Sequence, residues 1–271
     1  RIRNTLRFLL ANLADFDHDQ HGLPVDQWLE IDRYALALTQ KLQAGILADY
    51  ERYEFHLGVQ KFVGFCSEEL GGFYLDILKD RLYTAGENSH ARRAAQNALH
   101  HITHVLMRLM APILSFTAYE IWQTLKLGEQ TSVFEEQWYA LPPHGLNEQA
   151  LADWQTIVEV RSLANKRIEE KREQGLVGSS LQSEIDIYAE GATHAALSRL
   201  KDDLRFVLIV SRATLHDGSG ETRIEVIPSP HVKCDRCWHY RADVGVDTQH
   251  PSICGRCLSN LFGNGEPRHH A

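Results

Sequence analysis

Four cysteines near the end of the chain constrain its fold more than any other feature of the sequence. They form two C-x-x-C pairs, Cys234 with Cys237 and Cys254 with Cys257, and sixteen residues separate the pairs. Each C-x-x-C turn points two sulfurs the same way, so two turns can surround one metal ion with a tetrahedron of thiolates. The spacing lies within the range of four-cysteine zinc sites. We therefore predict one structural Zn²⁺ ion, because four thiolate ligands leave no open position for a catalytic water.

Two other interpretations of the cysteines stay open at this point. One is iron in a four-sulfur site, and the other is a redox-active pair, although no βαβ pattern surrounds these cysteines as it does in thioredoxin-like proteins. His231, His239 and His250 are nearby rival ligands, but four cysteines already complete the shell. The fifth cysteine, Cys66, stands among apolar residues and is expected to be a buried thiol. The distribution indicates metal binding rather than a disulfide framework, and hence a reducing compartment, which we take to be the cytoplasm.

Composition places the rest of the chain among ordinary globular proteins. The chain has 271 residues, of which 44% are apolar and 24% charged. At about 150 residues per domain, this length suggests two domains. No apolar run reaches the roughly 20 residues of a membrane helix, so we expect no membrane contact. The net charge is −8, so contacts with nucleic acid must come from local patches. Residues 1–10 lack a Met and a signal-peptide pattern, which indicates a piece of a longer protein.

The spacing of apolar residues divides the chain into three parts. Residues 1–143 show helical spacing, clearest over 89–111, and predict an antiparallel helical bundle that ends at the breaker LPPHG. Residues 144–229 predict a small α+β unit that begins with a long charged helix. Residues 230–271 have almost no apolar periodicity and are too few to fold without the metal, which contributes on the order of 10–16 kcal/mol. The fold class is mainly α: a helical bundle, then a small α+β unit and a C-terminal four-cysteine zinc ribbon.

Individual elements follow from the same spacing and from breakers. In the first part we expect helices over 1–14, 26–48, 89–111 and 112–127, and one or two helices within 49–79 that are interrupted near Gly71 and Gly72. In the second part we expect helices over 148–174 and 192–206 and strands over 183–190, 206–210 and 222–229.

Basic and aromatic side chains stand together around the first cysteine pair. Lys233, Arg236, Arg241 and Arg256 stand around the two cysteine pairs, with Trp238 and Tyr240 between them. Such a set suits RNA, because the cations pair with phosphates and the rings stack on bases. Acidic residues of the tail nearly cancel this charge, however, and packing of Trp238 over the zinc loop is an equally supported interpretation.

A polar face on the helix over 89–111 is a second candidate for RNA contact. Arg93, Asn97, His100, His104 and Arg108 cluster opposite its apolar stripe. The face is either a ridge that contacts RNA or an ordinary solvated face. In the helix over 148–174, an arginine instead lies in the centre of the apolar face.

That arginine, Arg161, needs a partner, because an unpaired buried charge is costly. A structural ion pair is one possibility, and contact with RNA or with another domain is the other.

No Ser/His/Asp set or Cys/His pair has supporting context anywhere in the chain. We therefore predict no catalytic residue.

Several segments resemble the C-terminal third of bacterial isoleucyl-tRNA synthetases, which are class I aminoacyl-tRNA synthetases. They include RIRNTLRFLLANLADFDHD, FYLDILKDRLYT, RRAAQNALHHITHVLMRLMAPILSFTAYEIW, VRSLANKRIEEKREQGLVGSSL and the ending CDRCWHY…CGRCLSNLFGNGEPRHHA. The resemblance covers the whole chain in the order of that family. Its helical bundle is shared with the valine, leucine, cysteine and methionine enzymes, whereas the cysteine ribbon singles out the isoleucine enzyme. Ser115 and Tyr119 depart from the usual PILPFTAEEIW signature.

The resemblance implies an anticodon-binding domain over 1–143, a junction domain over 144–229 and a zinc-binding tail over 230–271. The parent enzyme would be an isoleucine--tRNA ligase that attaches isoleucine to tRNA(Ile) with ATP. Its ATP-binding catalytic domain and its editing domain would lie upstream in the same polypeptide. The HIGH and KMSKS signatures are absent from this chain, so the chain alone is expected to carry no aminoacylation activity.

Residue by residue, the resemblance places Cys234, Cys237, Cys254 and Cys257 on the zinc positions of the family. It places Arg161 and Asn165 on a VR-x-x-x-N pattern and Arg236 and Trp238 on the first cysteine turn. We predict RNA contacts for these last four residues, and for Arg93 and Arg108 of the helix over 89–111.

The predicted role is binding of the anticodon stem-loop and positioning of tRNA(Ile), by a monomer. The alternative is a zinc-stabilised helical module that binds a protein partner and never contacts RNA. The overall acidity mildly favours that alternative, whereas the resemblance along the whole chain strongly favours tRNA recognition.

Overall fold

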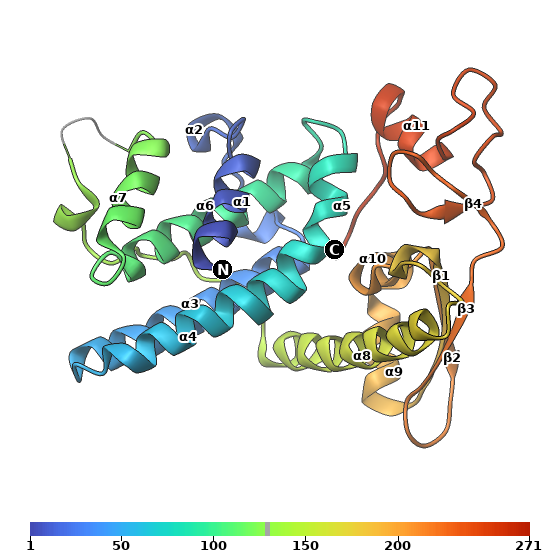
Figure 1. Cartoon of the computed structure of the whole chain (residues 1–271), viewed down its shortest axis with the longest axis horizontal. Coiled ribbons are helices and arrows are strands. Elements are labelled where there is room, and N and C mark those ends of the chain that lie inside the picture. Colours follow the sequence, from blue (N-terminus) through green and yellow to red (C-terminus); the bar gives the residue numbers. More distant parts are fainter. Residues whose placement is uncertain (128–130) are drawn as a thin grey trace. The chain divides into compact units, whose positions relative to one another are not determined.

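The computed structural model describes residues 1–127 and 131–271, which form two compact units (Figure 1). Unit 1 comprises Arg1–Asp76 and Arg92–Gly145, and unit 2 comprises Ile77–Ala91 and Leu146–Ala271. The first unit therefore ends close to the breaker at 141–145, but a segment from the middle of the bundle belongs to the second unit. No helix among the described residues is long and apolar enough to cross a membrane.

Unit 1 consists of helices and short helical turns. Its elements are α1 (Ile2–Asn12), α2 (His18–His21), a 3₁₀ turn η1 (Val25–Gln27), α3 (Glu30–Glu51), α4 (Phe55–Ser67), a π-helical segment η2 (Glu68–Leu75), α6 (His90–Met110), α7 (Ser115–Thr124) and a 3₁₀ turn η3 (Val133–Glu135). The apolar stripe predicted for 89–111 is confirmed, because Ala94, Ala98 and Ile102 of α6 are completely buried.

The interruption expected near Gly71 and Gly72 takes the form of a widened helix instead of a break. The chain passes from α4 through the π-helical η2 into α5 (Asp76–Thr84). A Cβ atom at Gly71 would lie 2.7 Å from the carbonyl oxygen of Cys66, so the wide turn requires a glycine here.

The helix predicted to open at Pro112 begins three residues later, at Ser115. The amides of Ile113 and Leu114 both donate to the carbonyl of Met110, so the end of α6 closes as a turn before α7 starts.

Unit 2 contains a three-stranded sheet with the order β2-β1-β3. Its elements are α5, α8 (Glu148–Glu173), a 3₁₀ turn η4 (Ser180–Gln182), β1 (Ser183–Ala189), α9 (Gly191–Arg199), a 3₁₀ turn η5 (Lys201–Asp203), α10 (Leu204–Leu208), β2 (Arg212–Asp217), β3 (Arg223–Pro228), β4 (Val232–Lys233), β5 (Tyr240–Arg241) and α11 (Gly255–Phe262). Strand β1 is parallel to β2 and antiparallel to β3. Asn147 caps α8 by accepting the amide of Ala150 at 2.8 Å.

The expected strand over 206–210 is wrong, because Phe206 to Leu208 belong to the helix α10. The residues Phe206, Val207, Leu208 and Val210 are all buried, and a short apolar run that is buried on every side has no period that separates helix from strand. Ile209 ends the helix with a left-handed backbone (φ 54°). The helix expected over 192–206 is likewise divided into α9 and α10 by η5. The fold class as a whole is confirmed: mainly helical, with a small α+β part and a cysteine-rich tail.

Candidate metal centre and its surroundings

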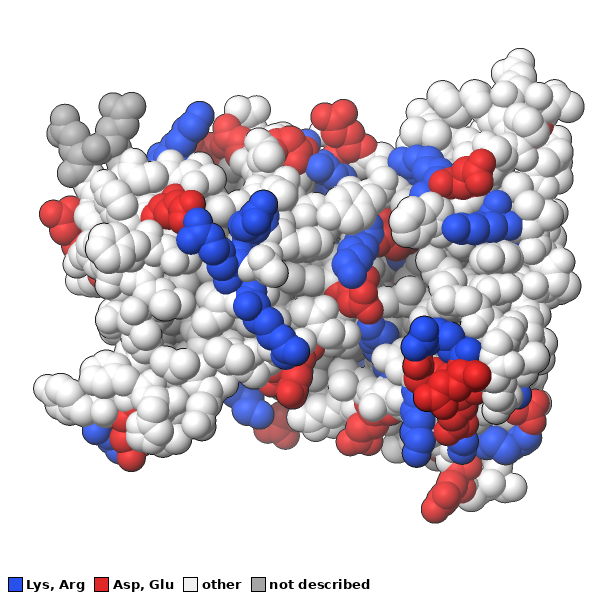
Figure 2. All heavy atoms as spheres, in the orientation of Figure 1, with Lys and Arg blue, Asp and Glu red and all other residues white. Residues whose placement is uncertain are grey.

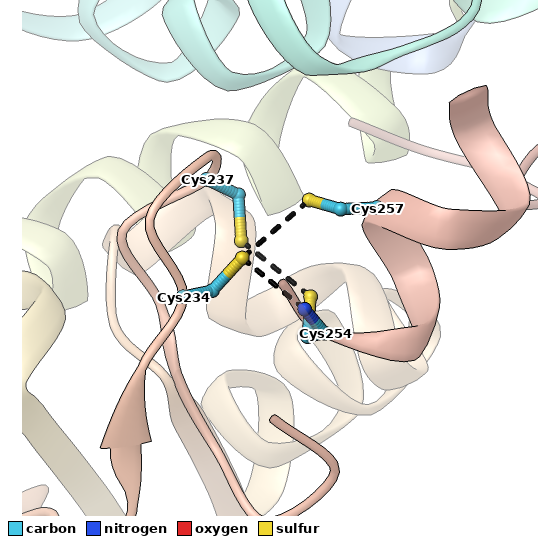
Figure 3. Close-up of side chains that lie close together, drawn as sticks. All are labelled: Cys234, Cys237, Cys254 and Cys257. Carbon is cyan, nitrogen blue, oxygen red and sulfur yellow. Dashed lines mark hydrogen bonds between the residues drawn. The ribbon is translucent and has the colours of Figure 1, made fainter. Parts of the chain in front are cut away.

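The four cysteines of the tail converge on one point (Figure 3). Their sulfurs all lie within 4.8 Å of one another, and the side chains are buried. The sulfurs of Cys234 and Cys257 are 3.8 Å apart, and those of Cys237 and Cys254 are also 3.8 Å apart. In a regular tetrahedron with a metal–sulfur distance of about 2.3 Å, neighbouring sulfurs are about 3.8 Å apart. The cluster therefore has the dimensions of a tetrahedral zinc site.

Close contact also couples the ionisation of the four thiols. Hydrogen bonds from Cys237 and Cys257 lower the pKa of Cys254 to about 3. Hydrogen bonds with Cys237 and Cys254 raise the pKa of Cys257 far above its usual range. Ionisation of one thiol in this cluster therefore opposes ionisation of its neighbours. A bound zinc ion would remove this conflict, because it deprotonates the thiols that coordinate it.

Two elements place the sulfurs. The short hairpin of β4 and β5 holds the first pair: the amide of Cys234 donates to the carbonyl of His239 at 2.8 Å, and the amide of Trp238 donates to the carbonyl of Cys234 at 2.9 Å. Cys254 is the N-cap of α11, and its amide donates to the sulfur of Cys234 at 3.3 Å. The N-terminus of a helix favours negative charge, which suits thiolate ligands.

The cysteines meet the geometry of a closed structural site. They are free thiols, so no disulfide replaces the metal. Among the described residues no other group of three or more histidine, cysteine, aspartate or glutamate side chains meets the same distance criterion. His100 and His104, which lie four residues apart on α6, are therefore not part of such a group.

A buried ionic network ties the tail to α5. Asp80 of α5 accepts hydrogen bonds from both terminal nitrogens of Arg256, each at 2.7 Å, and a further one from Arg268. Glu266 accepts from the same two arginines at 3.1 and 3.3 Å. Burial alone would raise the pKa of Asp80, but hydrogen bonding and charge from Arg256, with the charge of Arg268, hold that pKa well below its usual range. Both arginine side chains are almost fully buried, so each depends on these carboxylates.

A second anchor fixes the last residues of the chain. The buried carboxylate of Asp203, at the end of η5, accepts the backbone amides of His269, His270 and Ala271 at 2.9, 2.7 and 3.3 Å. Arg268 donates to the carbonyl of Ala271 at 3.0 Å. Neither Asp80 nor Asp203 could be predicted as an anchor, because nothing local to either residue signals a partner so far along the chain.

Arg236 and Trp238 lie on the first cysteine turn and behave differently. Arg236 is half-buried and donates to the carbonyl of Thr84 at 2.6 Å. Trp238 is 60% exposed and has a left-handed backbone with φ 66°. The ammonium of Lys233 lies 5.2 Å from the centroid of its ring. The ring is thus mostly open to solvent beside a cation, which differs from a ring packed over the zinc loop.

The polar face of α6 requires a correction. The sequence analysis treated it as solvent-exposed, either as a ridge that contacts RNA or as an ordinary surface. Arg93 and Arg108 are each only 8% exposed, and Asn97 is completely buried. Arg93 pairs with Asp15, and Arg108 pairs with Glu136 at 3.0 Å. Segments without helical periodicity cover the face, and a helical wheel cannot reveal them.

Histidines on the same face pack against rings from those segments. His18 stacks on His100 with ring centroids 4.6 Å apart, and His104 stacks on Tyr139 at 4.9 Å. The hydroxyl of Tyr139 lies 2.8 Å from Nδ1 of His101. Burial is the main cause that lowers the pKa of His100 to about 2, of His101 to about 4 and of His104 to about 3. These histidines are neutral parts of the packing at neutral pH.

The remaining predicted RNA residues lie on α8. Arg161 is buried, with 4% exposure, and it is not left without a partner, as its place in the apolar face requires. Asn165, one turn later, is exposed. The structure therefore offers the amide of Asn165 to solvent and keeps the guanidinium of Arg161 inside.

Comparisons with known proteins agree with this architecture. A family described as the anticodon-binding domain of tRNA ligase matches residues 32–187, and one described as a zinc finger found in FPG and IleRS matches residues 233–260. The chain is 57% identical over 271 residues to the isoleucine--tRNA ligase of Thiobacillus denitrificans, 55% over 276 residues to that of Bordetella petrii, and 54% over 275 residues to that of Cupriavidus pinatubonensis. These alignments cover 99–100% of the chain and 29% of each relative.

Proposed function

This chain belongs to the family of anticodon-binding domains of tRNA ligases, and from that membership we propose that it is the tRNA-recognition part of an isoleucine--tRNA ligase. One observation carries the proposal. Four buried sulfurs with the geometry of a zinc site follow a helical anticodon-binding domain, in a chain that aligns from end to end with isoleucine--tRNA ligases.

Within the longer polypeptide, this part binds the anticodon stem-loop of tRNA(Ile) and positions that tRNA. Attachment of isoleucine with ATP takes place in the catalytic domain, and proofreading in the editing domain, which are the covalent partners of this chain. The chain supplies no catalytic residue of its own. We further propose that the protein acts as a monomer in the cytoplasm, and that 1–143, 144–229 and 230–271 are its three functional divisions.

RNA contact through individual side chains fits the distribution of charge. Figure 2 shows basic and acidic side chains interspersed over the face that it draws, without a continuous basic field. With a net charge of −8, the chain attracts phosphates through particular arginines and lysines. Stacking on exposed rings adds attraction that does not depend on net charge.

The strongest candidates for these contacts are on the first cysteine turn. Trp238 presents an exposed ring beside Lys233, and a left-handed backbone at a bulky residue is a strained conformation of the kind that is often kept for function. Arg236 precedes it and is held by Thr84. The zinc ion, when bound, supplies a rigid crosslink between the two cysteine pairs, and so fixes the turn that carries Trp238.

The residues of the helices that we propose as RNA contacts differ in how exposed their side chains are. Asn165 is exposed and can donate and accept hydrogen bonds as it stands. Arg161, Arg93 and Arg108 are buried, and each would have to exchange an intramolecular partner for a phosphate. We therefore rank Asn165 and the first cysteine turn ahead of these three arginines.

A binding titration tests the proposal. The zinc-loaded chain is titrated with tRNA(Ile) and with a non-cognate tRNA at two salt concentrations. We expect tighter binding of tRNA(Ile), with an affinity that falls steeply as salt rises, because phosphate contacts release counterions. Absence of tRNA binding at low salt would refute the proposal. A zinc-stabilised module that docks a protein partner is the alternative; its apolar contacts would respond little to salt.

A further inference from the structure

Unit 2 contains a cavity of about 450 Å³ whose walls come from α10, β2 and β5. Three arginines line it: Arg205 from α10, Arg212 from β2 and Arg241 from β5. No motif in the sequence marks Arg205. The volume lies within the range of about 300–1,000 Å³ of ligand pockets in proteins, so a phosphate group fits easily.

The three arginines differ in how their charges are compensated. Arg212 donates to Glu184 at 2.7 Å and to Asp186 at 3.2 Å, so its charge is fully paired. Arg241 lies 3.6 Å from a carboxylate oxygen of Asp243, an ion pair without a hydrogen bond.

Arg205 makes no ion pair with any of the described residues, and its buried Nη1 has no hydrogen-bond partner among them. Its guanidinium rests instead on the ring of Phe206, with 4.3 Å between Cζ and the ring centroid. A half-buried guanidinium without a carboxylate partner is uncommon, because contact with a ring compensates only part of the water that the charge loses.

Positive charges outweigh negative ones around Arg205, where Glu266 offsets part of the repulsion from neighbouring arginines. Burial, followed by the charges of Arg241, Arg256 and Arg268, lowers its pKa to about 10. Arg256 and Arg268 already share Asp80 and Glu266 between them. An anion beside Arg205 would therefore relieve a repulsion that the folded protein otherwise retains.

The acidic side chains that line the cavity do not neutralise Arg205. Glu184 is engaged by Arg212 and by the hydroxyl of Ser229 at 2.8 Å. One oxygen of Asp243 accepts the amide of Gly255 at 3.1 Å, and the other faces Arg241. Asp202 is exposed and lies at the rim.

We propose that this cavity binds one backbone phosphate of the RNA, held by the guanidiniums of Arg205 and Arg241. The inference rests on the proposed function and deepens it, because it adds a phosphate contact between the α+β part and the zinc-binding tail. Two guanidiniums suit a phosphodiester, since their planar donor groups match its oxygens. Such a contact positions the RNA without reading its sequence.

The test compares charge-matched variants of the zinc-loaded chain. R205Q and R241Q each remove one cavity arginine, and R172Q removes an exposed arginine of α8 that is paired with Glu169. We expect R205Q to weaken tRNA(Ile) binding by about 10-fold or more, as loss of a charged hydrogen bond does. The slope of log affinity against log salt should fall by about 0.7–0.9. R172Q should bind within about twofold of the parent chain.

Zinc content and the thermal melting midpoint establish that each variant is folded. If R205Q does not fold, R241Q decides the question by the same two readouts. Equal affinity and equal salt slope for R205Q, R241Q and R172Q would overturn the inference and leave the proposed function standing. Loss of tRNA binding by the parent chain itself would instead refute the proposed function.

Inorganic phosphate distinguishes a site for a phosphate of the RNA backbone from a site for a free phosphate ion. We expect it to compete with tRNA(Ile) for the parent chain more effectively than for R205Q. If phosphate stabilises the parent chain but not R205Q, while both bind tRNA equally, the cavity is a site for a free anion, and the RNA assignment is wrong.

Discussion

Replacing Asp80 by asparagine tests how the zinc-binding tail is held. The side chain of Asp80 accepts two hydrogen bonds from Arg256 and another from Arg268. The side chains of these arginines are only 6% and 2% exposed. Asparagine keeps the shape of the side chain and removes its charge. Among the described residues, Glu266 then remains as the side-chain carboxylate that pairs with both buried guanidiniums.

The magnitude follows from that imbalance. Removal of one partner of a buried ion pair costs about 3–5 kcal/mol, because the other charge stays buried without compensation. Glu266 still neutralises one of the two arginines, so we place D80N at the lower end, at about 3 kcal/mol. The direction of the pH dependence of this stabilisation follows from the pKa of Asp80. The pKa of Asp80 is lowered in the folded state, so its contribution is present at neutral pH and is lost only in strong acid.

Urea unfolding of the zinc-loaded chain measures this difference at pH 7, with zinc release recorded in parallel. D217N is the matched control, because the side chain of Asp217 is 100% exposed and the substitution removes the same charge. We expect the unfolding midpoint and the zinc-release midpoint to fall together for D80N and to stay unchanged for D217N. Equal midpoints for the two variants would show that the network contributes nothing to the tail.

Three further predictions concern other parts of the chain. The folded state keeps His100, His101 and His104 neutral, with pKa values of about 2, 4 and 3, whereas unfolded histidines titrate near about pH 6.5. The contribution of these histidines to stability is therefore complete above that pH. It falls by up to about 1.4 kcal/mol per pH unit for each histidine as the pH drops toward 4. Urea midpoints at pH 7 and 5 measure this loss, and equal midpoints would show that the folded state does not keep these histidines neutral. W238A should weaken tRNA(Ile) binding by about 1–3 kcal/mol and leave zinc content unchanged, and unchanged affinity would remove Trp238 from the interface. C257S should abolish stoichiometric zinc by metal analysis, while C66S, a change at a buried thiol outside the cluster, should retain it.

The sequence predicted those features whose signal is local. The two C-x-x-C pairs specify the sulfur tetrahedron, because the geometry of each pair is contained in one turn. The helix expected over 148–174 is observed as α8, Glu148–Glu173, because a long run of helix-forming residues ends just before Gly175. The strand expected over 183–190 is observed as β1, Ser183–Ala189, because it alternates with the period of the pleat.

Features that depend on distant partners could not be predicted in this way. Asp80 contacts Arg256 and Arg268 across 176 and 188 residues of sequence, and no pattern links them. The polar face of α6 has the composition of a solvated surface, yet Arg93 and Arg108 are buried, because pieces of irregular chain fold over them. A run such as 206–210 carries too few residues to show a period, so its helix is set by packing alone.

Arg256 connects the metal centre to the ionic network, and this has a consequence for how the two stabilise the tail. The residue lies between the ligands Cys254 and Cys257 in the first turn of α11. When Asp80 is present, it fixes that turn through Arg256, and the turn presents two sulfurs before any metal is bound. Perturbations that act on one shared element are not additive. Removal of zinc by a chelator should therefore destabilise D80N less than it destabilises the parent chain, and D80N should bind zinc more weakly because it has to order the turn on binding. Additive losses would mean that the network and the metal hold separate parts of the tail, with Arg256 contributing to only one of them.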